Sequence, residues 1–415
     1  MLKFRWETEF KKTEIEEIPK DWEVTNLGDT RYFEIIPSGI KKFEGFKEYL
    51  STSSVEGNEI VKIEELITYD KRPSRANMQP VENSVWLARM INSPKFLKAN
   101  KDLIENKILS TGFLGIKTKK KEICYYLFYY IQTNEFQEYK DAYVTGAVQE
   151  SLTNENAKEL IVILPPLPEQ SRIATVLSWF DDLIENKKRQ NEILEKTAMA
   201  IFKNWFIDFE PFKDGEFVYN EELGKEIPKG WEVKSVEEDW ELIKGKKCCL
   251  SDVYNEGYNP YLLIETFKTG KVEFWTKEKE PCVEENDIVL VADGESSGKI
   301  LRYQKGILGS TLLTLKTKKR DSSLLKHFLY LTLKFYEDEI MSHRTGSAIP
   351  HLDKDYLKNF PLLLPPPSIL QSFHSLVEPL FQKIVLNQKQ IMTLRKIRDT
   401  LLPLLVFGKL RVEEI

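Results

Sequence analysis

One short segment carries side chains able to read DNA bases. Residues 69–78 run Tyr-Asp-Lys-Arg-Pro-Ser-Arg-Ala-Asn-Met, which places Arg72, Arg75 and Asn77 close together. An arginine guanidinium pairs with the two acceptors of guanine in the major groove, and an asparagine amide pairs in the same way with adenine. Pro73 would hold such a loop open. The competing interpretation is an ordinary solvated turn.

A second loop, residues 293–299, is built from small residues and could approach a nucleic-acid backbone closely. It reads Asp-Gly-Glu-Ser-Ser-Gly-Lys and Arg302 follows it, so Ser296, Lys299 and Arg302 are candidate contacts. A hairpin turn would explain the same residues. The loop is no nucleotide site, because its glycines stand too close together and Ile300 replaces the Ser or Thr of a phosphate-binding loop.

Lysine runs recur at 117–121 and 316–320. Because they repeat where sequence specificity should differ, they suit phosphate contacts better than base reading. A solvated charge run explains them equally well. The candidates are Lys119, Lys120, Lys121, Lys318, Lys319 and Arg320. Two further candidates, Arg344 and Ser347, flank a Thr-Gly pair that has a counterpart at Thr145-Gly146.

Catalytic constellations are not found. A DNA methyltransferase needs a glycine-rich cofactor loop and an Asn/Asp-Pro-Pro-aromatic tetrapeptide, whereas both Pro-Pro pairs here follow leucine. Neither the four histidines nor the four cysteines have metal-ligand spacing. We therefore expect no catalytic residue, no metal and no cofactor on this chain.

Composition sets the outer bounds. Hydrophobic residues make up 41% of the chain, and no apolar run approaches the length of a membrane helix. Charge interrupts every apolar pair at the start of the chain, so no secretory signal is predicted and a cytoplasmic location is expected. The net charge of −5 means that any DNA contact must come from local patches.

The chain contains an internal repeat. Residues 145–205 recur without a gap as 345–405, with Leu-Pro-Pro at 164–166 and 364–366. The segment 18–22 also resembles 227–231. Between these matches, roughly 30–105 and 240–305 show no similarity. We interpret the chain as a shared frame around two unrelated inserts, a pattern in which the variable part usually carries specificity.

Behind each Leu-Pro-Pro, apolar residues recur alternately three and four positions apart. A mean step of 3.5 over more than four heptads predicts a coiled-coil seam. The seam positions include Ile173, Leu177, Phe180, Ile184, Asn191, Leu194, Phe373, Val377, Leu380, Ile384, Asn387, Ile391 and Leu394. The polar members Asn191 and Asn387 would meet near the middle if the helices run antiparallel.

The fold class predicted is α+β, with two α/β domains, two long antiparallel coiled-coil helices and a pseudo-two-fold repeat. Pro379 and Pro403 predict a kink or break in the second helix. Strands are expected near 61–63, 65–69, 162–167 and 287–291, and a helix over 122–139. The predicted parts are an entry segment (1–22), a first domain (23–166), a helix (167–206), a linker (207–231), a second domain (232–366) and a second helix (367–412).

The segment Leu164-Pro-Pro-Leu-Pro-Glu-Gln170, followed by Ile173-Ala174 and Phe180-Asp181, resembles the DNA-specificity subunit of type I restriction-modification systems. The resemblance extends over residues 18–412, including the Thr-Gly pairs ahead of each Leu-Pro-Pro. The second copy departs from it, because residues 364–371 lack the glutamate and carry an extra proline.

The resemblance implies that each domain is a target recognition domain for one half of an asymmetric, bipartite site in double-stranded DNA. The helices would set the half-site separation and dock two methyltransferase subunits, with restriction subunits in the larger complex. S-adenosylmethionine would belong to the methyltransferase partner, and ATP and magnesium to the restriction subunit. Two alternatives stay open: a coiled-coil scaffold with two protein-binding domains, and an enzyme whose active site escapes recognition.

Overall fold

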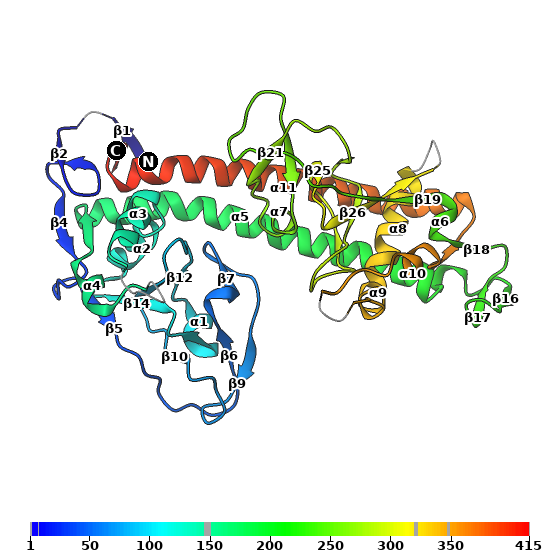
Figure 1. Cartoon of the computed structure of the whole chain (residues 1–415), viewed down its shortest axis with the longest axis horizontal. Helices are drawn as coiled ribbons and strands as arrows, with labels where there is room; N and C mark the ends of the chain where they lie inside the picture. The colour runs from blue at the N-terminus through cyan, green and yellow to red at the C-terminus, as the bar shows by residue number, and fades with distance from the viewer. Residues whose placement is uncertain (1, 7, 145–150, 319–322, 347–348, 415) are drawn as a thin grey trace. The chain divides into compact units, whose positions relative to one another are not determined.

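The computed structural model describes residues 2–6, 8–144, 151–318, 323–346 and 349–414 (Figure 1). The chain forms two compact units. Unit 1 comprises residues 1–182 and 395–415, and unit 2 comprises residues 183–394. In the part of the chain that the structure describes, no helix is long and apolar enough to cross a membrane.

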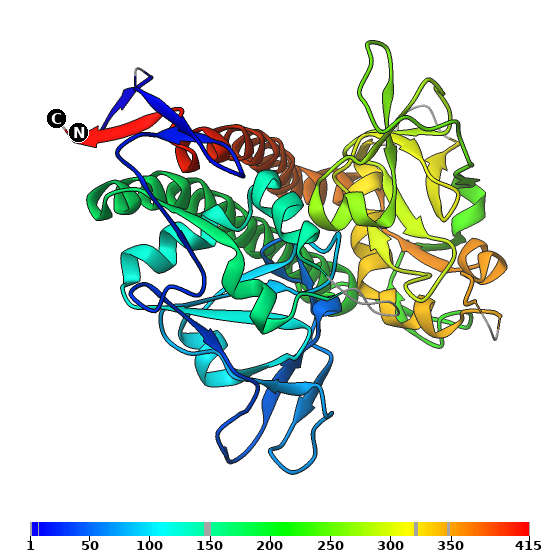
Figure 2. The same ribbon diagram turned by 60° about the vertical axis from the view of Figure 1, so that its left-hand side comes forward.

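The frame of unit 1 joins the two ends of the chain. Figure 2 shows the first and last strands side by side, and Phe4 is registered opposite Val412. Three antiparallel strand pairs make up this frame: β1 (Leu2–Arg5) with β28 (Arg411–Glu414), β2 (Phe10–Lys12) with β3 (Glu17–Pro19), and β4 (Glu23–Asn26) with β15 (Ile161–Leu164). The strand predicted near 162–167 is thereby confirmed as β15.

The first domain contains two four-stranded sheets. The large sheet is antiparallel, in the order β12 (Phe96–Lys98), β11 (Ser84–Ala88), β14 (Phe113–Thr118), β5 (Phe33–Ile36). The small sheet has the order β10 (Ala76–Met78), β13 (Lys107–Ser110), β6 (Lys47–Leu50), β9 (Glu65–Ile67), and its β13–β6 pair is parallel. Residues 61–63 form no strand, whereas β9 confirms the strand expected near 65–69.

Short elements complete the first domain. They are η1 (Thr52–Ser54), β7 (Val55–Glu56), β8 (Glu59–Ile60), α1 (Lys101–Asn106), α2 (Lys121–Tyr130), α3 (Asn134–Ala142) and α4 (Asn154–Glu159). The single helix predicted over 122–139 is wrong, because the chain turns at 131–133 and Thr133 caps a new helix by accepting from the Phe136 amide.

The side chains of strand β11 point alternately into two apolar cores, one on each face of the large sheet. In β11, Val85 and Leu87 pack into the core shared with α2, whereas Trp86 packs into a second core with the small sheet. Successive side chains of a strand point to opposite faces, so an uninterrupted apolar strand is buried on both sides. The same contact requires Gly115 in β14, because a Cβ there would lie 2.5 Å from the Trp86 ring.

The second domain repeats this arrangement in unit 2. Its large antiparallel sheet has the order β24 (Ile300–Leu301), β23 (Ile288–Val291), β26 (Leu312–Thr317), β19 (Trp240–Lys244). Its small sheet has the order β22 (Cys282–Val283), β25 (Gly306–Leu308), β20 (Asn259–Leu262), β21 (Phe274–Thr276), with a parallel β25–β20 pair. The strand expected near 287–291 is confirmed as β23.

Helices and frame hairpins complete unit 2. The helices are α6 (Val236–Asp239), α7 (Ile264–Thr269), α8 (Ser323–Phe335), α9 (Glu337–Ser342) and α10 (Lys354–Lys358). The hairpin strands are β16 (Phe217–Asn220) with β17 (Lys225–Pro228), and β18 (Glu232–Ser235) with β27 (Pro361–Leu364). Strand β23 is buried on both faces as β11 is, because Leu290 packs into the helical core and Val289 into the core of the small sheet.

The two domains therefore share one topology. In each, four strands of the large sheet and four of the small sheet follow the same order, and the same pair of small-sheet strands is parallel. The prediction of unrelated inserts is wrong at the level of the fold. Backbone hydrogen bonds define this topology and leave most side chains free to differ, which is why the sequences show no similarity.

Two long helices carry the seam. They are α5 (Leu167–Phe202), which continues into the short η2 turn (Lys203–Ile207), and α11 (Pro367–Val406). The prediction was a kink or a break at Pro379 and at Pro403; helix α11 runs through both prolines without a break. It ends before Gly408, whose φ of +68° suits glycine at a helix C-terminus.

The seam prediction is confirmed by burial. In unit 1, Ile173 and Leu177 share an apolar core with Leu405, and in unit 2, Leu194 packs against the core that contains Ile384. Every predicted seam position is buried or half-buried. The helices run antiparallel in unit 2, where Lys187 donates to Gln390 at 2.5 Å and Asn191 meets Asn387.

Glu169, which follows the first Leu-Pro-Pro, links both ends of the chain in unit 1 through hydrogen bonds. Glu169 is buried and accepts from Arg411 Nε at 2.6 Å and Nη2 at 2.7 Å, and from Trp22 Nε1 at 3.2 Å. In unit 2 the corresponding Trp231 packs on the aromatic rings of Phe206 and Phe209. In the second motif, Ile369 stands at the position of Glu169 and packs against the apolar core of unit 2.

Candidate nucleic-acid interface

Each large sheet has two ends that differ in what they present. The strands β5 and β19 finish at one end of their sheets, which we name the loop end. The strands β14 and β26 finish at the opposite end, which we name the helix end. The register fixes these ends: Ile36 lies opposite Gly115 and Phe33 opposite Thr118, as Lys244 lies opposite Leu313 and Trp240 opposite Thr317. A six-residue strand at about 3.3 Å per residue separates the two ends by roughly 20 Å.

The loop end of the second domain brings two predicted sites together. Residues 293–299 follow β23, and Arg344 reaches them by donating from Nη1 to the carbonyl of Glu295 at 2.6 Å. Gly294 N donates to the carbonyl of Pro350 at 2.8 Å, and Asp293 forms a β-bridge with His351. The loop and the frame junction, predicted separately, therefore form one surface.

Asp293 organises the charges of this surface. One carboxylate oxygen of Asp293 accepts from His351 Nδ1 and the other accepts from Lys244 Nζ, each at 2.8 Å. Burial alone would raise the pKa of Asp293, but these two hydrogen bonds outweigh it and leave the pKa lowered. The side chains of Lys299 and Arg344 are exposed, and Ser296 is half-buried. This surface can offer cations and a hydroxyl to a polyanion.

Arg302 does not belong to this surface, so its prediction as a DNA contact is wrong. The side chain is buried and donates to the carbonyl of Asn286 and to His327 Nδ1, each at 3.0 Å from Nη2. Its guanidinium also lies 4.6 Å from the ring of Tyr330 and 4.8 Å from that of Phe381. Arg302 therefore packs the second domain against α8 and α11.

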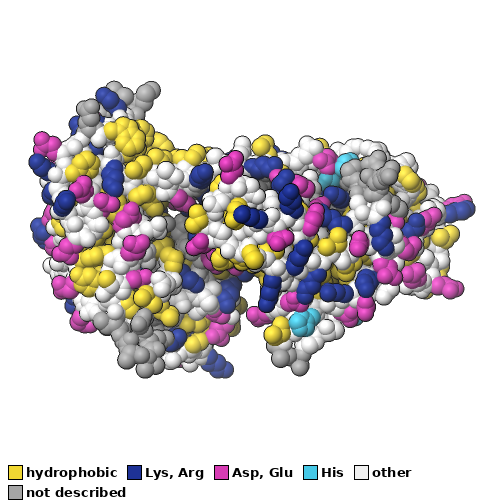
Figure 3. Space-filling model, turned by 45° about the horizontal axis from the view of Figure 1, so that its top comes forward, with side chains coloured by type: hydrophobic (Ala, Val, Ile, Leu, Met, Phe, Trp, Pro, Cys, Tyr) yellow, Lys and Arg dark blue, Asp and Glu magenta, His cyan; other side chains and the backbone are white. Residues whose placement is uncertain are grey.

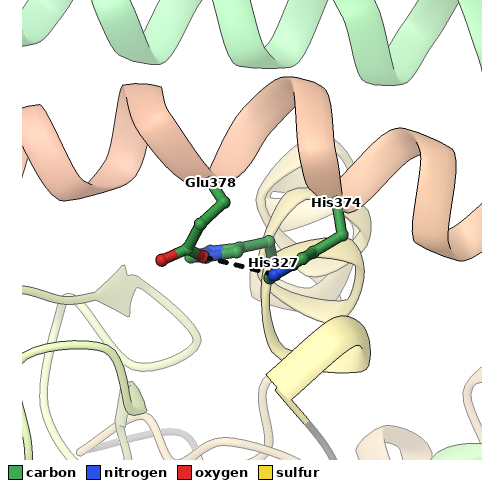
Figure 4. A group of neighbouring side chains, drawn as sticks. All are labelled: His327, His374 and Glu378. Atoms are coloured by element: carbon green, nitrogen blue, oxygen red, sulfur yellow. Dashed lines mark hydrogen bonds and ion pairs between the residues drawn. The ribbon is translucent and has the colours of Figure 1, made fainter.

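Behind Arg302 lies a group of side chains that spacing along the chain did not reveal. Figure 4 shows His327 from α8 facing His374 and Glu378, which stand one turn apart on α11. The three ligand atoms lie within 4.8 Å of one another, close enough to hold a metal ion. His327 Nε2 bonds to Glu378, and His374 Nε2 lies 3.7 Å from the same oxygen.

The hydrogen bonding of this group fits a neutral imidazole better than a metal ligand. An arginine can only donate, so Arg302 requires His327 Nδ1 to accept and leaves the ring proton on Nε2. A metal would need Nε2 free and an acceptor beside Nδ1. Burial, followed by the charge of Arg302, holds the pKa of His327 well below its usual range.

In the first domain, the loop 69–78 is fixed at the loop end. The guanidinium of Arg72 lies 4.4 Å from the Tyr69 ring and donates to the Tyr69 carbonyl. The carbonyl of Arg75 accepts from the amides of Asn77 at 2.8 Å and Thr111 at 2.9 Å. The Arg75 side chain is exposed, whereas Asn77 is half-buried and lies in strand β10 instead of a loop.

The shared lysine runs lie at the helix end, apart from these loops. Lys119, Lys120 and Lys121 are exposed between β14 and α2. Lys318 is exposed, and its ammonium donates to the carbonyl of Glu237 at 2.6 Å. The predicted contacts Lys319, Arg320 and Ser347, and the pair Thr145-Gly146, lie outside the described residues.

The sequence did not indicate Lys244 and His351 as site residues, because they reach Asp293 only through the backbone pairing of segments far apart in the chain. The internal repeat contained one indication of the position of His351. Met90 bridges Ser151 in unit 1 as Asp293 bridges His351 in unit 2, and the bridged partners lie 200 positions apart. In both units, a frame residue therefore pairs with the chain at the loop end of the domain.

Figure 3 shows lysine and arginine side chains interspersed with aspartate and glutamate on the visible face, in keeping with a net charge of −5. A binding surface must therefore be local. Two domains of one topology, each packed with its own segments of the two long helices, define a class of internally repeated α+β proteins.

Comparison with known proteins identifies the family within this class. The family model described as "Type I restriction modification DNA specificity domain" matches residues 19–196 and again 228–396. The chain therefore belongs to the type I restriction-modification DNA specificity subunits.

Relatives along the whole chain agree with this assignment. The type I restriction enzyme MjaIX specificity subunit of Methanocaldococcus jannaschii is 39% identical, over 100% of this chain and 99% of that protein. The HindI specificity subunit of Haemophilus influenzae is 22% identical, over 94% and 100%. The crystal structure of an S subunit from M. genitalium has the same fold, with a TM-score of 0.51 and 19% identity over 93% of this chain and 96% of that one.

Proposed function

We propose that each domain reads one half of an asymmetric, bipartite target in double-stranded DNA. The observation that carries this proposal is one topology presented twice with different side chains at the loop end. Arg75 and Asn77 occupy that end in the first domain, and Lys299 and Arg344 occupy it in the second. Different donors favour different bases, so the two half-sites should differ.

The helices then act as the spacer between half-sites. Helix α5 has 36 residues. At 1.5 Å per residue it spans about 54 Å. That length corresponds to roughly 16 bp of B-DNA at about 3.4 Å per base pair. The continuous seam supports a spacer of fixed length, because knobs-into-holes packing resists sliding.

The helix pair also docks two methyltransferase subunits in this proposal. In unit 2 it carries a groove of about 330 Å³ lined by Leu183, Lys187, Lys389, Gln390, Thr393 and Leu394. Leu386 and Ile193 expose about half of their side chains on the same helices. Exposed apolar side chains on a rigid element favour a protein partner.

The reaction itself belongs to the partners. The methyltransferase subunits would bring S-adenosylmethionine and flip the adenine out of the duplex. Restriction subunits would bring ATP and magnesium. The role of this chain is to choose the sequence, and the chemistry proceeds at the partners' active sites.

A domain exchange tests the division of labour. Residues 232–344 are replaced by the corresponding segment of another family member, and the methylated motif of the assembled complex is mapped. One half-site should change while the other and the spacing stay the same. A change in both half-sites would contradict the proposal. A scaffold lacking DNA affinity is a separate outcome, seen when the unaltered complex shows no salt-sensitive binding to DNA.

A further inference from the structure

Both domains carry a loop of similar make-up at the same place in the fold. It connects the first strand of the large sheet to the small sheet, between β5 and β6 at 37–46 and between β19 and β20 at 245–258. The second loop begins with Gly-Lys-Lys, whereas in the first loop Gly39 is the third residue and Ile40 separates it from the Lys-Lys pair. Both loops end with Glu-Gly-aromatic. The shared residues are Gly39, Lys41, Lys42, Glu44, Gly45 and Phe46 in the first loop, and Gly245, Lys246, Lys247, Glu256, Gly257 and Tyr258 in the second.

The matching glycines have structural reasons. Gly45 and Gly257 have φ of +75° and +81°, a region that favours glycine, so both loops turn in the same way before entering the small sheet. At their starts, Gly39 N donates to the Asn77 carbonyl and Gly245 N to the Leu312 carbonyl, each at 2.8 Å. Both loops are therefore anchored at the loop end, beside the candidate base readers.

The paired lysines of these loops are exposed and unneutralised. Among the described residues, none of Lys41, Lys42, Lys246 and Lys247 forms an ion pair with an acid. By contrast, Lys316 at the helix end pairs with Asp287. Free ammonium groups at one place in two otherwise different domains suit a ligand feature that does not depend on sequence, which in DNA is the phosphate backbone.

Aromatic rings accompany the lysines in both domains. In the first, Phe43 packs edge-on against Tyr69 at 6.0 Å, and Lys47 lies 5.4 Å from the Phe43 ring. In the second, Tyr254 packs against Trp275 at 4.9 Å. A cation also lies near a ring there: Lys277, which follows β21, lies 5.4 Å from the ring of Tyr258. The neighbouring Phe46 is 71% exposed and Tyr254 is 58% exposed. Basic residues interleaved with exposed rings are typical of nucleic-acid surfaces.

We propose that these two loops are the paired DNA-backbone contacts of the recognition domains. Lys41 and Lys42 in one domain, and Lys246 and Lys247 in the other, bind phosphates flanking each half-site. Phe46 and Tyr254 lie against the sugar or base edges of the same strand. This inference rests on the proposed function, and it assigns the contacts to the loop end in place of the lysine runs at the helix end.

The test uses the complex assembled with its methyltransferase and measures duplex affinity against salt concentration. Separate K41A/K42A and K246A/K247A variants should each flatten the slope of log K against log [salt] by about 1.8, with roughly tenfold or greater loss at 0.1 M salt. Cognate and non-cognate duplexes should lose affinity by the same factor, and the methylated motif should stay unchanged. K41R/K42R should restore the slope, which separates a charge effect from misfolding.

The lysine run at the helix end gives the matched comparison, because K119A/K120A removes the same charge from the same domain. A slope change in K119A/K120A equal to or larger than that in K41A/K42A would overturn the assignment. A changed motif would overturn it too, since phosphate contacts carry no sequence information. If the unaltered complex fails to bind DNA, the proposed function itself fails, which is a different result.

The role proposed for Phe46 and Tyr254 is tested by a separate measurement of DNA affinity. F46A and Y254A should weaken binding at every salt concentration without altering the slope, because stacking involves no counterion release. Unchanged affinity in both variants would remove the rings from the proposed contact.

Discussion

Asn387 donates a hydrogen bond from Nδ2 to Oδ1 of Asn191 at 2.8 Å inside the seam of unit 2. Both side chains are buried. The other polar atoms of the pair, Asn191 Nδ2 and Asn387 Oδ1, have no hydrogen-bond partner among the described residues. These residues were expected to meet if the helices run antiparallel, and the structure shows that they do. A half-satisfied amide pair costs stability but penalises any shift of one helix along the other.

Replacing both asparagines by leucine should stabilise the protein. N191L/N387L removes two buried unpaired polar atoms, so we expect a melting temperature higher by a few degrees, at about 2–4 °C per kcal/mol. Either single variant leaves one amide unpaired and should lower the melting temperature. Calorimetry of the three variants decides the matter, and an unchanged or lower value for the double variant would disprove the register role.

Arg302 is expected to act on stability and leave sequence choice unaltered. R302M removes the hydrogen bonds to Asn286 and His327 and the contacts with Tyr330 and Phe381. We expect a loss of about 3 kcal/mol in the free energy of unfolding. The methylated motif should stay the same. K299M, which removes an exposed charge at the loop end, is the control for charge removal in the stability measurement and should change the free energy of unfolding little. A new motif with unchanged stability in R302M would restore Arg302 as a base reader.

The contact of Glu169 with Arg411 should show strong coupling. R411M leaves the carboxylate of Glu169 buried without its ion pair, so it should cost about 3 kcal/mol in the free energy of unfolding. E169Q should cost less, because Arg411 keeps its ion pair with Asp21. The double variant E169Q/R411M should lose less than the sum, because the second change removes the charge that the first left unpaired. Urea unfolding of the three variants measures the coupling. Additive losses would show that the two residues act independently.

Asp287 should make stability depend on acid pH. Burial alone would raise its pKa, but hydrogen bonds from Lys316 and Lys326 outweigh burial and leave the pKa lowered. A lowered folded-state pKa contributes stability above the unfolded value of about 3.9, and this contribution is lost as pH falls through the folded value. The difference in unfolding free energy between the unaltered chain and D287N should be full at pH 6. It should shrink below about pH 4. A difference that stays constant with pH would contradict the assignment.

Much of the frame could be predicted from the sequence because it depends on local, periodic features. The seam follows from a 3.5-residue period, and the meeting of Asn191 with Asn387 follows from the seam once the helices run antiparallel. The common topology of the two domains could not be predicted, since β5 and β19 match in hydrogen bonding but not in side chains. Arg302 was misplaced because its partners, His327 and Phe381, come from helices distant in the sequence. Of the kink or break expected at Pro379, the break does not occur, because packing against neighbouring elements keeps the helix continuous.

The most direct test of the central claim is a methylome. This chain is co-expressed with its own methyltransferase subunit in a host free of DNA methylation, and N6-methyladenine is mapped at base resolution. The account predicts a split motif with two different half-sites and a fixed unread spacer, present only when this chain is present. Absence of chain-dependent methylation from a complex confirmed to be soluble and assembled, or a continuous motif without a spacer, would contradict it.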